Sequence, residues 1–211
     1  MTRQDFRKLA ASLTSLVLLS VCLFIAWPTQ GGVFSWQSRQ KTITKYEHRK
    51  MPLRFGKVKA AGKFIELQPG PESQESQGGF DGDDDWMKGL TVSFKNTSDR
   101  NIVYFRLDLM FPETEGPKPM MAFPLIFGRR PKDAEDRNYD RLLAPGEEVE
   151  LSLTDERYGR LRNFLKNGSF DKVTSVRLFL ETVIFDDDIM WNGGDLYRRN
   201  QNDPNNWLPI R

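Results

Sequence analysis

Hydrophobic and polar residues alternate over much of the chain, with the two-residue period of a β-strand that is buried on one face. Leu90, Val92 and Phe94 alternate with polar residues, and the run from Val103 to Phe111 continues the same pattern. Polar residues at 96–99 separate the two runs, as expected of a turn. The sequence therefore predicts two adjacent antiparallel strands with alternate residues buried.

Three further segments have the character of strands. Residues 121–127 are apolar and precede a polar loop, residues 148–153 alternate after a Pro-Gly turn, and residues 173–185 form one long strand with Val176, Leu178 and Leu180 in phase. The phase of these patterns gives a set of residues that we expect to be buried: Val92, Phe94, Phe105, Leu107, Leu151 and Leu178.

One helix is expected between the strands. Thr154 is a suitable N-cap, and Tyr158, Leu161 and Leu165 share one helical face before Asn-Gly at 167–168 ends the helix. No parallel βαβ repeat is visible. The pattern therefore predicts an all-β, immunoglobulin-like β-sandwich of six or seven strands with one short crossover helix.

Two stretches carry a family resemblance. The runs VSFKNTSDRNIVYFRLDLMF (92–111) and LLAPGEEVELSL (142–153) resemble small bacterial membrane-anchored immunoglobulin-like extracytoplasmic domains, in which an Asn-Thr-Ser turn joins two strands and a Pro-Gly-Glu turn opens a later one. The resemblance implies a sandwich fold outside the cytoplasm, and a role in adhesion, assembly or ligand binding.

The N-terminal segment 9–27 contains nineteen residues without a charge, long enough for a transmembrane helix. We interpret it as a retained signal anchor. A cleaved signal peptide and a lipoprotein signal with Cys22 lipidated are alternatives. Arg7 and Lys8 adjoin the apolar run directly, which favours residues 1–8 in the cytoplasm and the main domain outside it.

Charge divides the rest of the chain, although the net charge is only +2. We expect a basic juxtamembrane stalk at 28–51 and a sandwich domain at 52–188, which contains an exposed acidic loop at 68–88. The aromatic and polar residues 189–211 then form a C-terminal tail.

Few residues for catalysis are present. The chain has one histidine, His48, expected to lie outside the fold, and one cysteine, Cys22, in the apolar segment. A Ser-His-Asp or Cys-His arrangement and an ordinary zinc site are therefore excluded, and we predict that the protein is not an enzyme and needs no cofactor. The charge balance also gives no reason to expect a nucleic-acid partner.

Calcium is the one ion for which the sequence offers candidate ligands. Asp81, Asp83 and Asp85 have the alternate spacing that lets carboxylates converge on one ion, although Trp86 stands where an EF-hand requires glycine. The acidic triplet at 186–188 supplies two more candidate ligands, Asp186 and Asp188, if the fold brings both loops to the same end. We interpret the stretch as a solvated acidic loop, with a calcium site as the alternative.

Aromatic residues cluster with arginine and asparagine near the C-terminus, as in many carbohydrate- and peptide-binding surfaces. We favour the interpretation in which the same aromatics cap an open sheet edge, and a binding surface is the alternative. The candidate binding residues are Trp86, Trp191, Tyr197, Arg198, Arg199 and Trp207.

Two functions are consistent with these patterns. The first is a non-catalytic, single-pass membrane protein, held in the bilayer by residues 9–27, whose extracytoplasmic domain binds another envelope protein or forms part of a larger assembly. The second is a glycan- or calcium-dependent surface-binding domain.

Overall fold

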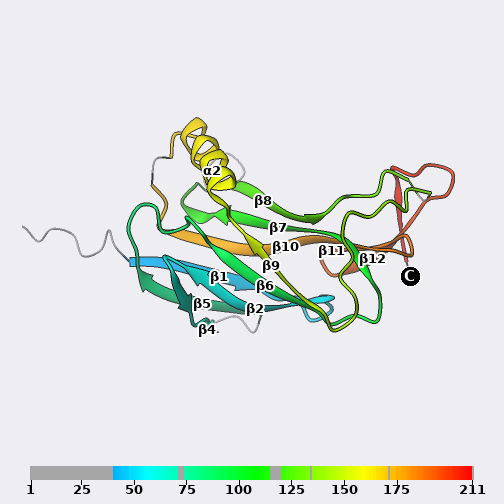
Figure 1. The fold of residues 1–211 in the computed structure, drawn as a ribbon, viewed down its shortest axis with the longest axis horizontal. Helices are drawn as coiled ribbons and strands as arrows, with labels where there is room; N and C mark the ends of the chain where they lie inside the picture. Colours follow the sequence, from blue (N-terminus) through cyan, green and yellow to red (C-terminus); the bar gives the residue numbers. More distant parts are fainter. Residues whose placement is uncertain (1–39, 71–73, 115–119, 134, 171, 211) are drawn as a thin grey trace, which may run out of the picture. The chain divides into compact units, whose positions relative to one another are not determined.

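The structure, a computed structural model, describes residues 40–70, 74–114, 120–133, 135–170 and 172–210 (Figure 1). These residues form two β-sheets and one α-helix. The elements are β1 (Gln40–Tyr46), β2 (Leu53–Ala60), β3 (Lys63–Ile65), β4 (Gln68–Pro69), β5 (Glu75–Asp81), β6 (Thr91–Asn96), β7 (Ile102–Phe111), the 3₁₀ helix η2 (Pro112–Thr114), β8 (Met121–Gly128), β9 (Glu148–Ser152), α2 (Asp155–Asn167), β10 (Ser175–Phe185), β11 (Ile189–Asn192), β12 (Asp195–Arg199) and β13 (Trp207–Pro209).

The strands divide into a larger and a smaller sheet. The smaller sheet has the order β3-β2-β6-β9, and all its neighbours are antiparallel. The larger sheet has nine strands: β13-β12-β11-β10-β1-β5-β4 form one path, and β7 and then β8 follow on the other edge of β10. The prediction of an all-β protein with two sheets is therefore confirmed, with more strands than the sequence indicated.

Strand β10 is the centre of the larger sheet. It pairs with β7 along one edge, and its other edge is shared by two strands. The parallel strand β1 pairs with the first half of this edge, up to Tyr46 opposite Phe179. The antiparallel strand β11 begins farther on, with Asn192 opposite Thr182. On this edge of β10, Leu180 and Glu181 therefore pair with neither β1 nor β11.

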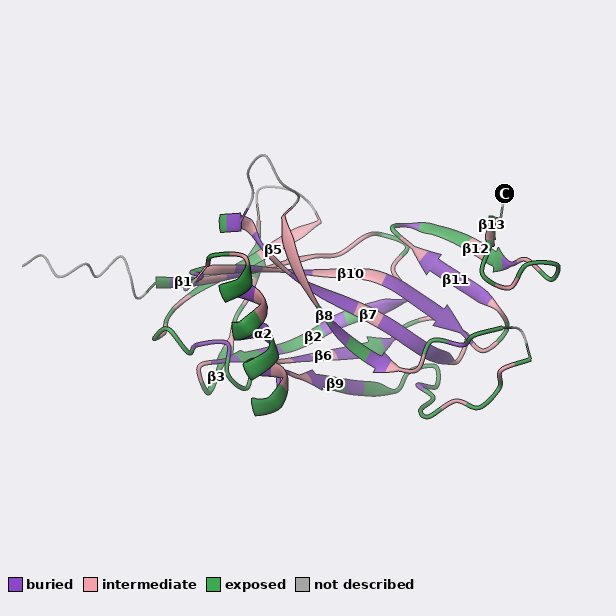
Figure 2. Cartoon of the chain, turned by 90° about the horizontal axis from the view of Figure 1, so that it is seen from above, coloured by how far each residue is buried: buried purple, intermediate pink, exposed green. Residues whose placement is uncertain are grey.

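The two sheets meet across a single large hydrophobic core (Figure 2). Four phenylalanine rings form a continuous column through it. Phe55 of β2 lies 4.8 Å from Phe94 of β6, Phe94 lies 5.1 Å from Phe105 of β7, and Phe105 stacks on Phe127 of β8 at 5.0 Å, all between ring centroids. The column joins two strands of each sheet, so these rings hold the sheets face to face.

The phase of the strands was predicted correctly. All six residues expected in the core are buried, and Val176 and Leu180 of β10 are buried with them. The run from Val103 to Phe111 also has its alternate residues buried, although Val103 packs in a second, smaller cluster with Tyr104, Ile184 and Met190.

The pairing of the first two predicted strands was wrong. β6 belongs to the smaller sheet and β7 to the larger one, so the turn between them carries the chain from one sheet to the other. Asn96 is fully buried there and donates hydrogen bonds from Nδ2 to the carbonyl oxygens of Arg100 and Leu143, at 2.8 and 2.9 Å. Its Oδ1 accepts a bond from the Ser98 amide at 3.0 Å. The polar residues of this turn therefore stabilise the passage of the chain from one sheet to the other.

The helix α2 has the limits expected from its sequence. The hydroxyl of Thr154 accepts a hydrogen bond from the amide of Arg157, and Gly168 caps the C-terminal end. Tyr158, Leu161 and Leu165 are its buried residues, as predicted. Contacts between Phe164 and Phe123 of β8 place the helix against one end of the sandwich (Figure 1).

The domain limits read from the sequence need correction at three places. Gln40–Tyr46, expected in a stalk, is strand β1, in which Ile43 lies in the core. Glu75–Asp81, expected in an exposed loop, is strand β5, which pairs with β1 over its whole length. The expected tail contains β11, β12 and β13, which extend the larger sheet. The charged residues of these strands obscured the pattern because each strand has one solvated face.

Among the residues that the structure describes, no helix is both long enough and apolar enough to span a bilayer. The segment 9–27, which we interpret as a signal anchor, lies outside the described residues, as do residues 28–39 of the expected stalk.

Replacing Phe105 by alanine is expected to lower the free energy of unfolding by about 3–5 kcal/mol, because the change removes the ring that contacts both Phe94 and Phe127. Chemical denaturation of the purified protein measures this. The control is Phe64→Ala, since Phe64 is 71% exposed and its loss should cost less than about 0.5 kcal/mol. Equal losses of stability in the two variants would contradict the role of the phenylalanine column in holding the sheets together.

Glu113 of η2 is expected to stabilise the start of β10 in a pH-dependent way. Its carboxylate accepts hydrogen bonds from the amide and hydroxyl of Thr174, both at 2.7 Å, and from the amide of Ser175 at 2.5 Å. Loss of hydration acts to raise the pKa of Glu113, but these bonds outweigh it and hold the pKa below its ordinary value of 4.5.

Because the folded-state pKa is lowered, the contribution of Glu113 is present above pH 4.5 and is lost as the pH falls through the folded-state value. Glu113→Gln should therefore lower the free energy of unfolding by about 1 kcal/mol at pH 7, a value that allows for the partial solvent exposure of the carboxylate. The difference in stability between the variant and the wild type should become smaller in acid. Thermal unfolding between pH 7 and pH 3 measures it. Glu66→Gln, at an exposed carboxylate, is the matched control, and a pH-independent difference would contradict the assignment.

Candidate binding site

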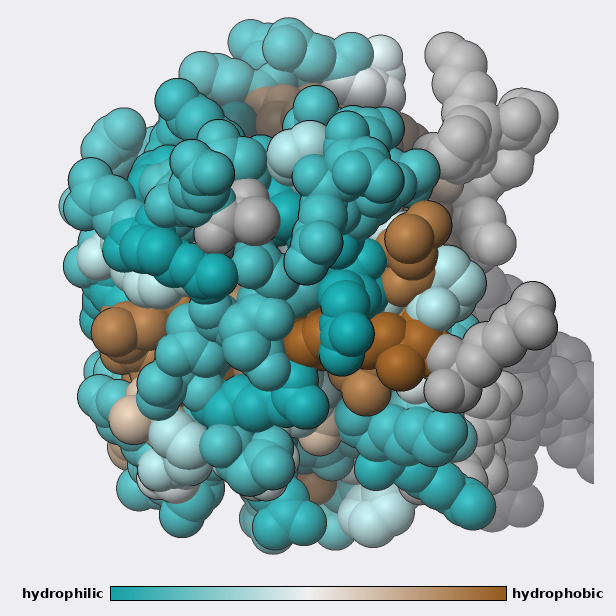
Figure 3. All heavy atoms as spheres, turned by 90° about the vertical axis from the view of Figure 1, so that its right-hand side faces the viewer, coloured by the Kyte–Doolittle hydropathy of each residue, from teal (hydrophilic) through white to brown (hydrophobic). Residues whose placement is uncertain are grey.

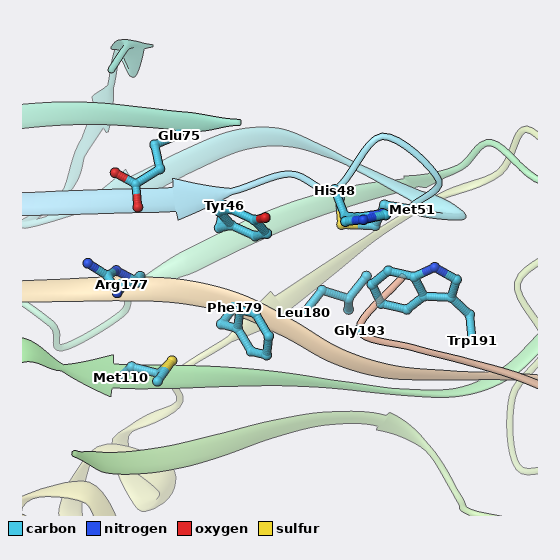
Figure 4. Close-up of a pocket in the computed structure, with 10 residues that line it drawn as sticks. All are labelled: Tyr46, His48, Met51, Glu75, Met110, Arg177, Phe179, Leu180, Trp191 and Gly193. Carbon is cyan, nitrogen blue, oxygen red and sulfur yellow. The ribbon is translucent and has the colours of Figure 1, made fainter. Parts of the chain in front are cut away.

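A cleft of about 490 Å³ opens on the outer face of the larger sheet, beside the centre of β10 (Figure 4). Its volume lies within the range of known ligand-binding cavities. We call it the β10 cleft, and its lining residues are Tyr46, His48, Met51, Glu75, Met110, Arg177, Phe179, Leu180, Trp191 and Gly193.

Strand register explains why these side chains converge. Val176 and Leu178 point into the core, so the alternate residues Arg177 and Phe179 project from the opposite face of β10. Residues opposite one another on neighbouring strands share a face, and Phe179 lies opposite Tyr46 of β1. Tyr46 in turn lies opposite Glu75 of β5. Three strands therefore present their side chains to one cleft.

The cleft has an aromatic end (Figure 4). The rings of His48 and Trp191 lie 6.4 Å apart, with Met51 beside them. The backbone of Gly194 passes so close to His48 that a Cβ at this position would lie 2.6 Å from the imidazole, and its φ of +109° also requires glycine. His48 is therefore part of the fold, which corrects the expectation that it lies outside.

Tyr46 and Phe179 form the middle of the cleft, with ring centroids 6.3 Å apart. The other end carries charge: Arg177 and Glu75 lie there together with Met110 (Figure 4). The two opposite charges do not form an ion pair with each other or with any other residue that the structure describes.

Nearby acidic side chains are already paired with another arginine. Arg106 Nε lies 2.8 Å from a carboxylate oxygen of Asp108 and 2.9 Å from one of Glu181. The hydrogen bond with Asp108 raises the pKa of Arg106 despite its partial desolvation. By register these two acids are the residues of β7 and β10 nearest to Arg177 on the outer face, so their pairing with Arg106 leaves Glu75 of β5 as the acid that shares the cleft with Arg177.

Two buried donors lack an acceptor. Of the buried side-chain nitrogen and oxygen atoms in the described part of the chain, only Arg177 Nε and Trp191 Nε1 have no hydrogen-bond partner. Both residues line the β10 cleft. A buried donor without a partner costs about 1–3 kcal/mol, so native proteins contain few of them. Two side chains with an unused buried donor therefore line the same cavity.

The candidate aromatic residues do not form one surface. Trp86 is 1% exposed, and its indole N–H donates to the Val173 carbonyl at 3.0 Å, so it belongs to the core. Trp191 is 3% exposed and lines the β10 cleft. The third tryptophan, Trp207, lies at the opposite edge of the C-terminal strands, on β13.

Arg199 is a structural residue. It is 4% exposed, its Nε lies 3.2 Å from a carboxylate oxygen of Asp188, and its guanidinium lies 4.6 Å from the centroid of the Trp207 ring. Its neighbour Arg198 is exposed, and Tyr197 is half-buried. Figure 3 looks onto this end of the domain, where hydrophilic residues cover most of the surface. The arrangement is that of a cap over the end of the larger sheet.

The two acidic clusters lie at opposite ends of β10. Asp84, in the first cluster, pairs with Lys172 before β10 begins, whereas residues 186–188 follow its last residue. Eleven residues at about 3.3 Å each separate the clusters by roughly 35 Å, so Asp81, Asp83 and Asp85 cannot share an ion with Asp186 and Asp188.

The acidic side chains also have partners within the domain. Asp85 accepts a hydrogen bond from the Tyr158 hydroxyl at 2.8 Å, Asp186 accepts one from Asn101 at 2.8 Å, and Asp188 pairs with Arg137 at 2.9 Å. No group of three or more His, Cys, Asp or Glu side chains that could hold a metal ion occurs in the described ranges.

Sequence reasoning identified Trp191 but missed the rest of the β10 cleft. The alternation of the predicted strand already placed Arg177 and Phe179 on its outward face, because Val176 and Leu178 were assigned to the core. What could not be read from the sequence was that β1 lies beside β10, because the two strands are about 130 residues apart in the chain.

Comparison with known proteins gives no match: no family model, no curated protein and no solved structure is similar to this chain.

Proposed function

We propose that this protein is a non-catalytic, membrane-anchored interaction module whose extracytoplasmic domain binds another envelope protein through the β10 cleft. The observation that carries the proposal is the joint presence along that cleft of an arginine without an ion-pair partner and four aromatic rings, one of which, Trp191, has a buried N–H without an acceptor. Arginine and aromatic side chains in partly desolvated pockets are the residues that contribute most to protein–protein affinity.

The lining of the cleft argues against catalysis. The ten residues contain one carboxylate, one histidine and no serine or cysteine, so they supply neither a serine or cysteine nucleophile with its base nor a carboxylate pair. The anchor rests on the apolar segment 9–27 and on the basic residues that precede it.

Strand connectivity supports the immunoglobulin-like type. In that fold strands A, B and E lie in one sheet and C, F and G in the other. Taking β2, β6 and β9 as A, B and E gives the smaller sheet, and taking β7, β10 and β11 as C, F and G gives the centre of the larger sheet. Strand β8 then corresponds to C′, and α2 lies in the E–F connection. Immunoglobulin-like domains serve many unrelated binding functions, so the fold supports the class of function only.

Protease added to spheroplasts is expected to remove the folded domain while leaving a fragment of the N-terminal segment in the membrane fraction. An antibody to a C-terminal tag follows the loss. A cytoplasmic protein must remain intact in the same sample, as the control for lysis. Full protection of the tag would reverse the proposed orientation, and a soluble mature form would show that the segment is cleaved.

Phe179→Ala is expected to reduce recovery of the partner at least tenfold when the full-length protein is purified from detergent-solubilised membranes, because it removes the central ring of the cleft. Phe64→Ala is the matched control, since it makes the same change on an exposed strand of the other sheet. Thermal unfolding of both variants shows whether any loss arises from misfolding.

A photoreactive phenylalanine analogue placed at position 46, and separately at position 64, gives a second readout of the same proposal. Crosslinks to one protein from position 46 alone support the cleft as its binding site. Equal recovery with all variants, or equal crosslinks from both positions, would reject that site. Release of the bound material by glycosidase or by a calcium chelator would favour the glycan- or calcium-dependent alternative.

A further inference from the structure

We propose that the β10 cleft recognises a carboxylate adjoining an aromatic group, with Arg177 as the charge partner of the carboxylate. This inference rests on the proposed function of the cleft as a binding site and specifies the chemistry of what it binds. It follows from three features of the cleft: its charge, its unsatisfied donors and the shape of its walls.

The first feature is the free charge of Arg177. The guanidinium is half-buried on the outer face of β10, and it makes no hydrogen bond or ion pair with any described residue. A guanidinium offers five N–H donors in a planar fork, which matches the two oxygens of a carboxylate. Asp108 and Glu181, which could have neutralised it, are bound to Arg106.

The second feature is the buried donor Nε of Arg177. Because this atom has no acceptor within the described chain, removing the guanidinium breaks no hydrogen bond of the folded domain. Nε itself is buried, so an anionic ligand would reach the guanidinium through its two terminal nitrogens, which are not among the buried atoms and also make no hydrogen bond within the described chain. The indole N–H of Trp191, at the other end of the cleft, is the second unsatisfied donor and is 3% exposed.

The third feature is the aromatic wall between the two donors. Tyr46 and Phe179 lie between Arg177 and Trp191 (Figure 4). Aromatic faces favour planar apolar groups through stacked and edge contacts. Glu75 also stands at the charged end and repels any anion there, so a ligand with one carboxylate is less disfavoured than a polyanion.

The experiment uses the full-length protein in non-ionic detergent and two probes of the same shape, 1-naphthoate and 1-naphthamide, titrated by calorimetry against protein and against empty micelles. Saturable binding of 1-naphthoate is expected, with 1-naphthamide at least tenfold weaker. Arg177→Met should lower the affinity for 1-naphthoate at least tenfold and change the affinity for 1-naphthamide by no more than about twofold.

Arg198→Met is the matched control, because Arg198 is an exposed arginine of β12, outside the cleft. It should leave the affinity for both probes unchanged. Arg177→Met should also unfold at the wild-type temperature or higher, which separates loss of the ligand contact from loss of the fold. In the ¹⁵N NMR spectrum, the indole N–H signal that disappears in Trp191→Phe should shift when 1-naphthoate binds to the wild type.

Equal affinity for the two probes, an unchanged affinity in Arg177→Met, or no saturable binding at millimolar 1-naphthoate would each overturn the inference. If Phe179→Ala still abolished partner recovery in that case, the proposed interaction function would stand without it. Conversely, if 1-naphthoate binds with the expected charge dependence but no protein crosslinks from position 46, the result would support the ligand chemistry, assign the cleft to a free aromatic acid, and reject the envelope partner.

Discussion

The contact between the two sheets is the interaction on which the rest of this domain depends. The sheets share no hydrogen-bonded ladder in the described residues, so burial of side chains between them must hold them together. The column of Phe55, Phe94, Phe105 and Phe127 spans this space. Its position also explains why the β6–β7 turn has a fully buried asparagine: the chain must leave one sheet and enter the other within a few residues, and Asn96 satisfies the backbone carbonyls exposed by that crossing.

The position of β10 then determines where a binding site can form. Its inward residues belong to the core, and one of its edges is shared between β1 and β11, which approach from different parts of the chain. The β10 cleft lies at the junction of the two strands, lined by the last residue of β1, by Leu180 of β10 and by Trp191 of β11. Rigid strands on both sides hold these side chains, an arrangement that keeps the shape of a site constant before its ligand arrives.

Local patterns in the sequence were sufficient for strand phase and for the helix, because both depend on neighbouring residues. Thr154, Tyr158 and Leu165 gave the limits and the buried face of α2, and the phase of Val92 and Phe105 gave the core. Pairing between distant strands was not accessible: β1 resembled a basic stalk because Lys41 and Lys45 interrupt its pattern, and β6 and β7 were placed in one sheet because short turns commonly join neighbours. The cleft depends on those distant pairings, so only Trp191 among its residues was identified in advance.

At Arg177 the interactions that would favour folding differ from those that would favour the proposed binding function. An arginine that served only solubility would extend its guanidinium into water, and one that served only stability would pair with the acids beside it. Arg177 makes no ion pair, and its Nε is buried without an acceptor, while Arg106 pairs with both neighbouring carboxylates. The fold maintains an unsatisfied positive group in an aromatic cleft, at a cost to its own stability. Strained or unsatisfied features of this kind concentrate at functional sites, because there the missing partner is supplied by what binds.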